Sequence, residues 1–217
     1  MGAGCDALRD FGESPRAVPS TQPRFRETPE VCHILLQDPR LYMLLLEADQ
    51  ERAAAVRAGG CSCGGVLHSA PYPRKPRGLP LEFRQVDHER WRFCCNRDGC
   101  RSRHTPQSVL YLGRRVYVGA MMLLGTVLRC AVSGRALREL CELLGIPRAT
   151  LDRWRAWWNG EFPVGDFWLA MRGDFVPPVS SPLPAELLAR FTATDPVIQL
   201  AQALRFVAPL STQTEGR

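Results

Sequence analysis

The segments that decide the fold are Gly60-Cys-Ser-Cys-Gly-Gly65 and Arg92-Phe-Cys-Cys-Asn-Arg-Asp-Gly-Cys100. Each contains at least two cysteines beside glycine, which is typical of tight turns. Structural zinc sites are tetrahedral and are usually built from four cysteines, or from cysteine with histidine. Two turns that each deliver two thiolates therefore predict a structural Zn²⁺ site. The predicted ligands are Cys61, Cys63, Cys95 and Cys100.

Cys94 competes with Cys95 for one of these four positions. Alternation along a strand directs neighbouring side chains to opposite faces, so one ion does not bind both thiols. Cys94 follows Arg92-Phe93, where an apolar residue is usual in a metal-binding ribbon, and this favours Cys95 as the ligand. His68 and His104 remain alternative ligands.

The positive charge lies in the middle of the chain. The 217 residues have a formal net charge of +6, and residues 61–115 contain 11 Lys and Arg against 4 acidic residues, or +7. This excess is a weak indication of a polyanionic partner.

No apolar signal segment precedes residue 60, and the apolar run 116–128 is too short to span a bilayer. With nine cysteines, an odd number, these features favour a reducing cytoplasm, or the nucleoid if DNA is bound, and no membrane partner.

Composition and hydrophobic periodicity predict an α+β fold in five segments. A helix is expected from about Asp38, with Pro39 at its first position, to Ala58, before Gly59-Gly60. Short strands are expected near Leu81, Phe83 and Val86, and near Trp91 and Phe93. The expected segments are a disordered tail (1–28), a helical segment (29–60), a zinc ribbon with short antiparallel strands (61–113), a helix followed by a helix-turn-helix (114–159), and a proline-rich segment with short helices near 184–191 and 195–206 (160–217).

Residues 133–159 have the pattern of a helix-turn-helix. Leucines recur at helical spacing, and Gly145 follows them at the place where such a motif needs a turn. An arginine-rich second helix comes next. The residues predicted to face inward are Leu137, Leu140, Leu144, Ile146, Leu151, Trp154 and Trp158.

The outward residues of the second predicted helix are candidates for DNA contacts. In helix-turn-helix proteins, the start of this helix reaches base edges in the major groove. Arginines of the ribbon are candidates for phosphate contacts, because guanidinium groups pair well with phosphate. The predicted DNA-binding residues are Arg148, Ala149, Thr150 and Arg153 on the helix, and Arg74, Lys75, Arg77, Arg101, Arg103, Arg114 and Arg115 elsewhere.

The order of a cysteine ribbon, a helix and a helix-turn-helix resembles small zinc-ribbon/helix-turn-helix proteins and N-terminal modules of bacterial insertion-sequence transposases. The resemblance covers roughly residues 61–158, including Arg92-Phe93-Cys94-Cys95 and the basic stretch Arg101-Ser-Arg-His-Thr-Pro106. It implies binding of double-stranded transposon-end or operator DNA, with a second copy of the chain or a transposase as further partner.

Transposase chemistry needs about three carboxylates on a sheet of their own, and the proline-rich, acid-poor residues 159–217 are too few for such a domain. The expected function is therefore a transposon-related helper, regulator or domesticated DNA-binding module that is not an enzyme. The alternative is a protein-interaction adaptor that uses the ribbon and helical hairpin as a docking surface.

Overall fold

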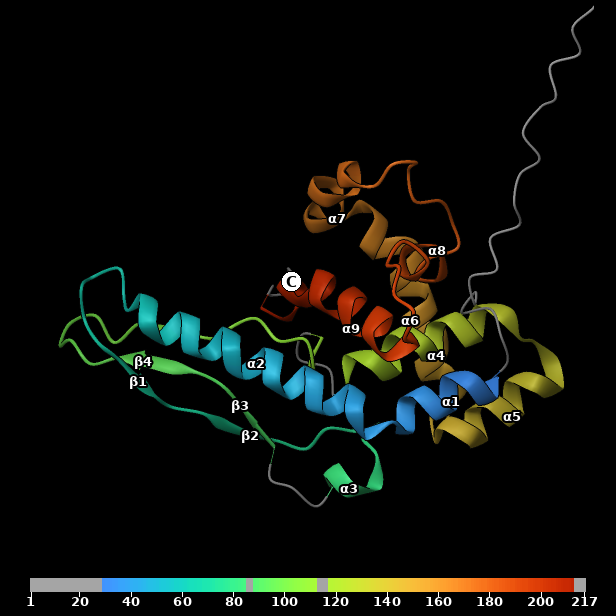
Figure 1. Cartoon of the computed structure of the whole chain (residues 1–217), viewed down its shortest axis with the longest axis horizontal. Helices are drawn as coiled ribbons and strands as arrows, with labels where there is room; N and C mark the ends of the chain where they lie inside the picture. The colour runs from blue at the N-terminus through green and yellow to red at the C-terminus, as the bar shows by residue number, and fades with distance from the viewer. Residues whose placement is uncertain (1–28, 85–87, 113–116, 213–217) are drawn as a thin grey trace, which may run out of the picture.

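The computed structural model describes residues 29–84, 88–112 and 117–212, and it has the mixed α+β composition that was predicted. Figure 1 shows an arm, formed by α2 and the strands, that projects from a body of helices. The longer helices are α1 (Pro29–Gln37), α2 (Pro39–Gly59), α4 (Gly119–Ala131), α5 (Gly134–Leu144), α6 (Arg148–Ala156) and α9 (Pro196–Val207). None of the helices in these ranges combines the length and apolarity needed to cross a bilayer.

Helix α2 forms one side of the arm. The Asp38 side chain accepts a hydrogen bond from the backbone N–H of Arg40 (2.9 Å), and Pro39 follows at the first helical position. At the other end Gly60 has φ of 67°, a left-handed value that glycine adopts without steric cost. The predicted start and end of this helix are therefore confirmed.

The strands form a long hairpin beside α2 (Figure 1). The three-stranded sheet has the antiparallel order β1 (Leu67–Ser69), β4 (Phe93–Cys95), β5 (Arg103–His104). Further along the same hairpin, β2 (Tyr72–Arg74) pairs with β3 (His88–Arg90). Ala53 of α2 packs with Leu67 and Phe93 in a small core, so the helix and hairpin support each other.

The expectation of strand near Leu81 and Phe83 was wrong, because these residues lie in the short helix α3 (Leu81–Arg84). Val86 lies outside the described residues. Pro76 and Pro80 follow β2 and have no N–H to donate to a sheet ladder. The chain therefore leaves the sheet after Arg74 and makes a helical turn before it returns as β3.

In the helical body, α4 is surrounded by other elements. Every residue from Gly119 to Leu128 is buried, including Thr126, whose hydroxyl donates to the carbonyl of Met122. Helix α6 crosses it closely, because a Cβ at Gly125 would lie 3.3 Å from side-chain atoms of both Leu151 and Trp154. Helices α5 and α6 are joined through Gly145, which is left-handed (φ 62°). All seven residues predicted to face inward are buried.

Residues 160–212 are more ordered than their proline content suggested. The predicted C-terminal helices are present as α8 (Ala185–Leu188) and α9, but α7 (Asp166–Met171) was not predicted. Short π and 3-10 turns continue α6 through Trp157–Glu161 and Phe162–Val164. A chain of ring contacts then joins Trp158, Phe162, Trp168, Phe175 and Phe206. This cluster attaches the C-terminal segment to the end of α6.

A buried polar joint connects the arm to the helical body. Asp49 of α2 accepts hydrogen bonds from the Ser108 hydroxyl and from the backbone N–H of Val109 (2.7 Å). Arg90 of β3, also buried, donates to the carbonyl of Pro106. Burial raises the pKa of the Asp49 carboxyl, because water no longer solvates its charged form. These contacts orient the hairpin against the segment that leads into α4.

Candidate metal centre

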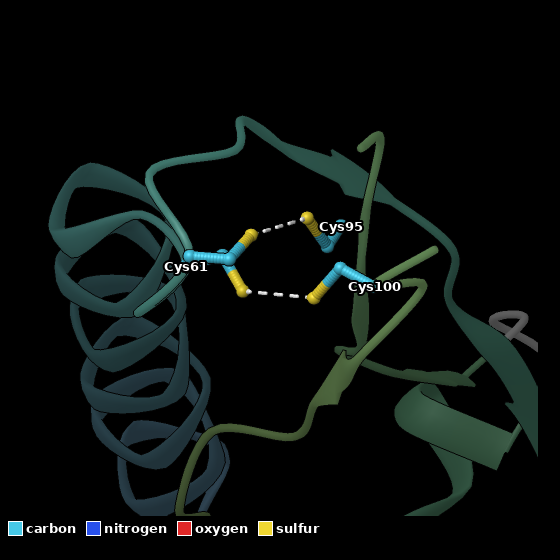
Figure 2. Close-up of side chains that lie close together, drawn as sticks. Cys61, Cys95 and Cys100 are labelled. Atoms are coloured by element: carbon cyan, nitrogen blue, oxygen red, sulfur yellow. Dashed lines mark hydrogen bonds between the residues drawn. The ribbon is translucent and has the colours of Figure 1, made fainter. Parts of the chain in front are cut away.

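Four cysteine side chains meet at the outer end of the arm. The Sγ atoms of Cys61, Cys63, Cys95 and Cys100 all lie within 4.8 Å of one another. The Sγ atoms of Cys61 and Cys100 lie 3.7 Å apart and those of Cys63 and Cys95 lie 3.5 Å apart, and Figure 2 shows Cys61, Cys95 and Cys100 pointing towards one another. A tetrahedral zinc ion with Zn–S bonds of about 2.3 Å requires sulfurs about 3.8 Å apart. The cluster therefore has the size and the donor atoms to hold a metal ion.

Each pair of cysteines lies in a tight turn, and each turn contains an equivalent backbone hydrogen bond. In the first turn, the N–H of Cys61 donates to the carbonyl of Gly65 (3.1 Å), two residues after Cys63. In the second turn, the N–H of Cys95 donates to the carbonyl of Ser102 (2.9 Å), two residues after Cys100. The two turns thus have the same closing hydrogen bond, although one residue separates the cysteines of the first turn and four residues separate those of the second.

The residue after the last cysteine is left-handed in both turns. Gly64 has φ of 81° in the first turn, and Arg101 has φ of 47° in the second. Arg101 is the sole non-glycine residue with positive φ within the described ranges. Beside it, Gly99 has φ of 82°, as the Asp-Gly step predicted. In both turns the chain reverses directly after the second cysteine, which lets the residue after this reversal accept the hydrogen bond from the N–H of the first cysteine.

The structure favours Cys95 over Cys94. Cys95 is buried among the other three thiols, whereas the Cys94 sulfur contacts the carbonyls of Cys95 and Arg101. The two side chains lie on opposite faces of β4, as strand alternation requires. His68 pairs with Cys94 in the sheet and His104 pairs with Phe93, and neither belongs to the four-residue cluster.

Neighbouring groups distinguish the thiols. Hydrogen bonds from the side chain and backbone of Ser102 lower the pKa of Cys100 to about 6. The backbone N–H of Arg97 donates to Cys95 Sγ (3.4 Å) and lowers its pKa, but burial and the neighbouring thiols outweigh this and raise it to about 12. Cys100 is thus the first of the two to ionise. A bound cation would favour the thiolate form of every ligand and release the remaining protons.

Gly65 makes room for the cluster, which leads to a first prediction. A Cβ at this position would lie 2.5 Å from Cys95 Sγ and 3.1 Å from Cβ of Arg97. Gly65→Ala should therefore displace Cys95 and weaken zinc binding by about 10- to 100-fold, the range for changes next to metal ligands. Competition with a chromophoric chelator measures this. Gly59→Ala is the matched control, because nothing lies within 4 Å of its added Cβ, and equal zinc affinity in all three proteins would contradict the steric role of Gly65.

The structure separates the residues predicted to contact DNA. On α6, Arg148, Ala149 and Arg153 are exposed, but Thr150 is buried and its hydroxyl accepts from Arg153 (3.1 Å). Thr150 therefore lies beneath the surface rather than on it. In the arm, four of the predicted residues are exposed and one, Arg74, is half-buried over the Tyr111 ring. The four exposed residues are Lys75, Arg77, Arg101 and Arg103. Arg114 and Arg115 lie outside the described residues.

The orientation of Arg148 depends on a contact that sequence patterns did not reveal. Asp152 of α6 accepts a hydrogen bond from Arg129 of α4 (2.7 Å) and also pairs with Arg148 (3.4 Å). Arg129 is nearly buried, with 11% of its side chain exposed, whereas the Asp152 side chain is 41% exposed. Burial raises the pKa of Asp152, but the two arginines outweigh it and lower that pKa overall. The carboxylate therefore stays charged and restrains Arg148 at the start of α6.

Comparison with known proteins identifies no relative. No family model matches the chain, and neither the curated proteins nor the solved structures contain a significant match. The cysteine cluster and the exposed face of α6 are therefore the features of this structure that bear on its function.

Proposed function

We propose that this protein is a zinc-dependent DNA-binding protein in which a zinc ribbon supports a helix-turn-helix. The cysteine cluster supports the metal part of this proposal. Four thiolates favour Zn²⁺ over Mg²⁺ or Ca²⁺, which prefer oxygen ligands. With four protein ligands the ion has no open position for substrate or water, so its role is structural.

The observation that carries the DNA part is the division of α6 into two faces. Leu151 and Trp154 are buried against α4, whereas Arg148, Arg153 and Arg155 are exposed. A helix held by its apolar side with several arginines on the other is suited to enter the major groove. Arginine recognises guanine there through two parallel hydrogen bonds. In this proposal Arg148 and Arg153 read bases, and arginines of the arm contact phosphates.

We base the proposed biological role on the resemblance to insertion-sequence proteins. The chain would act as a helper or regulator at transposon ends or operators. It would act as a homodimer or together with a transposase. The protein-interaction adaptor is the competing function, and the same experiment distinguishes the two.

If the protein binds DNA, its affinity for a DNA duplex should fall strongly as the salt concentration rises. Each phosphate contact releases condensed counterions, so the logarithm of the binding constant falls by about 0.9 per contact for each logarithmic unit of salt. Fluorescence anisotropy with labelled duplexes between about 50 and 200 mM salt measures this slope, a range over which 6–10 contacts cost about 10³–10⁵ in affinity. A flat response in the zinc-loaded protein, together with a stable protein complex, would favour the adaptor function.

If α6 reads bases, removing its exposed arginines should reduce the preference of the protein for its selected DNA sequence. On a duplex selected from a random pool, Arg148→Ala and Arg153→Ala should each cost about 1–3 kcal/mol, because each removes a two-pronged contact to a base. Affinity for an unselected duplex should fall less. Arg172→Ala and Arg205→Ala are charge-matched controls, since both arginines are exposed on the C-terminal segment. Equal losses in all four variants would contradict base reading by α6.

A further inference from the structure

We propose that Tyr111, Arg74 and Arg90 form a binding site for a small free oxyanion, such as inorganic phosphate, at the buried joint between the arm and the helical body. The anion accepts hydrogen bonds from the tyrosine hydroxyl and from the two guanidinium groups. It thereby adds a charged contact between the strands β2 and β3 and the segment that leads into α4. This site is separate from the cysteine cluster and from α6.

The hydroxyl of Tyr111 is the first observation. The side chain is 3% exposed, and its hydroxyl is buried without a hydrogen-bond partner among the described residues. A buried polar group that lacks a partner costs folding energy, and in native proteins such groups commonly contact a water molecule or an ion. The unpartnered hydroxyl therefore indicates a ligand from solution.

Two arginines determine the charge of that ligand. Arg74 of β2 lies over the Tyr111 ring, with its guanidinium carbon 4.9 Å from the ring centroid. Arg90 of β3 is 4% exposed and donates to the carbonyl of Pro106. Burial raises the pKa of Tyr111 to about 12, although both guanidinium charges act to lower it. The hydroxyl therefore stays protonated at neutral pH and lies beside two cations, which is an environment that attracts an anion.

The carboxylate of Asp49 lies at the same joint but does not form an ion pair with Arg90 in the described part of the chain. It accepts hydrogen bonds from the Ser108 hydroxyl and the Val109 N–H instead. Burial lowers the pKa of Arg90, and Arg74 adds to this effect as a like charge, whereas Asp49 opposes it. An anion held between the two arginines relieves their repulsion and compensates for the burial of Arg90.

The depth of the site distinguishes it from the surface proposed for DNA. Arg90 and Tyr111 are almost completely buried. The other described arginines that were predicted to contact DNA are exposed on α6 and on the arm. A phosphate within a DNA backbone stays attached to the duplex and does not reach side chains at this depth, whereas a free ion does. Arg74, which was predicted to contact DNA phosphate, is thereby assigned to a different ligand.

Tyr111→Phe tests the site because it removes only the hydroxyl. Isothermal titration calorimetry of the zinc-loaded protein with inorganic phosphate, against sodium chloride of equal ionic strength, should show saturable binding. Tyr111→Phe should weaken this binding by about 10- to 100-fold, the loss expected for one hydrogen bond to a charged group. Arg74→Ala should weaken it as well. Arg205→Ala is the matched control for an exposed arginine, and its affinity for phosphate should equal that of wild type.

Thermal unfolding separates ligand binding from a structural role of the hydroxyl. In chloride alone, Tyr111→Phe should have a Tm equal to or above that of wild type, because it removes an unpartnered buried group. Phosphate should raise the Tm of wild type more than that of the variant. A lower Tm of the variant in chloride, equal phosphate affinity in both proteins, or absence of saturable phosphate binding by wild type would each overturn the inference. The proposed zinc and DNA binding would stand in all three cases.

Discussion

Replacing Cys95 with serine is expected to abolish stable zinc binding, whereas Cys94→Ser should leave one zinc ion per chain. Both variants remove a sulfur from adjacent positions on β4. Only Cys95 lies among the other ligands, with Sγ 3.5 Å from that of Cys63. A serine hydroxyl is a poor substitute for a thiolate, and the loss should exceed the about 10- to 100-fold that changes around a ligand cost. Cys61→Ser should behave as Cys95→Ser does.

Native mass spectrometry with and without a chelator measures this difference directly. Wild type and Cys94→Ser should each carry one zinc ion that the chelator removes, and Cys95→Ser should carry none. Because structural zinc contributes to folding, loss of metal should also make the arm more sensitive to proteolysis. Retention of zinc by Cys95→Ser, together with its loss from Cys94→Ser, would reverse the ligand assignment. Absence of metal from the wild-type protein would reject the zinc site.

The four-cysteine cluster could be predicted because its determinants are local. Turn residues beside each cysteine pair and the alternation of β4 depend on a few neighbouring positions, and these were sufficient to prefer Cys95 over Cys94. The zinc itself stays a prediction. The buried face of α5 could be predicted equally well, because the helical spacing of Leu137, Leu140 and Leu144 shows which side of the helix is apolar.

Other features could not be predicted because they depend on residues far apart in the chain. The buried hydrogen bond of Asp49 needs Ser108, which lies 59 positions later in the chain. From sequence alone, an aspartate in a helix is expected to be exposed to solvent. Burial of Thr150 beneath Arg153 likewise depends on how closely α6 approaches α4. In the proline-rich C-terminal segment, short helices could be predicted near 184–191 and 195–206, but α7 (Asp166–Met171) could not. Its order comes from aromatic contacts with α6 that no local pattern contains.

Because of these aromatic contacts, we expect replacement of Trp158 to cause a large loss of folding stability. The side chain is fully buried, with ring centroids 4.6 Å from Phe162 and 4.9 Å from Trp157. Trp158→Ala should lower the free energy of unfolding by about 3–5 kcal/mol, through lost burial and the cavity left behind. For a chain of this size that corresponds to a fall in Tm of roughly 6–20 °C. Thermal unfolding in excess zinc keeps the metal contribution constant.

Two variants test whether this loss comes from the aromatic cluster. Trp158→Phe keeps a ring against Phe162 and removes an indole N–H that has no hydrogen-bond partner among the described residues, so it should cost much less than alanine. Trp157→Ala should also cost less, because Trp157 is only half-buried. If Trp158→Ala cost under about 1 kcal/mol, the C-terminal segment would fold independently of α6. Because α6 continues directly into the turns that carry Trp158, a large loss means that residues 160–212 stabilise the proposed DNA-reading helix.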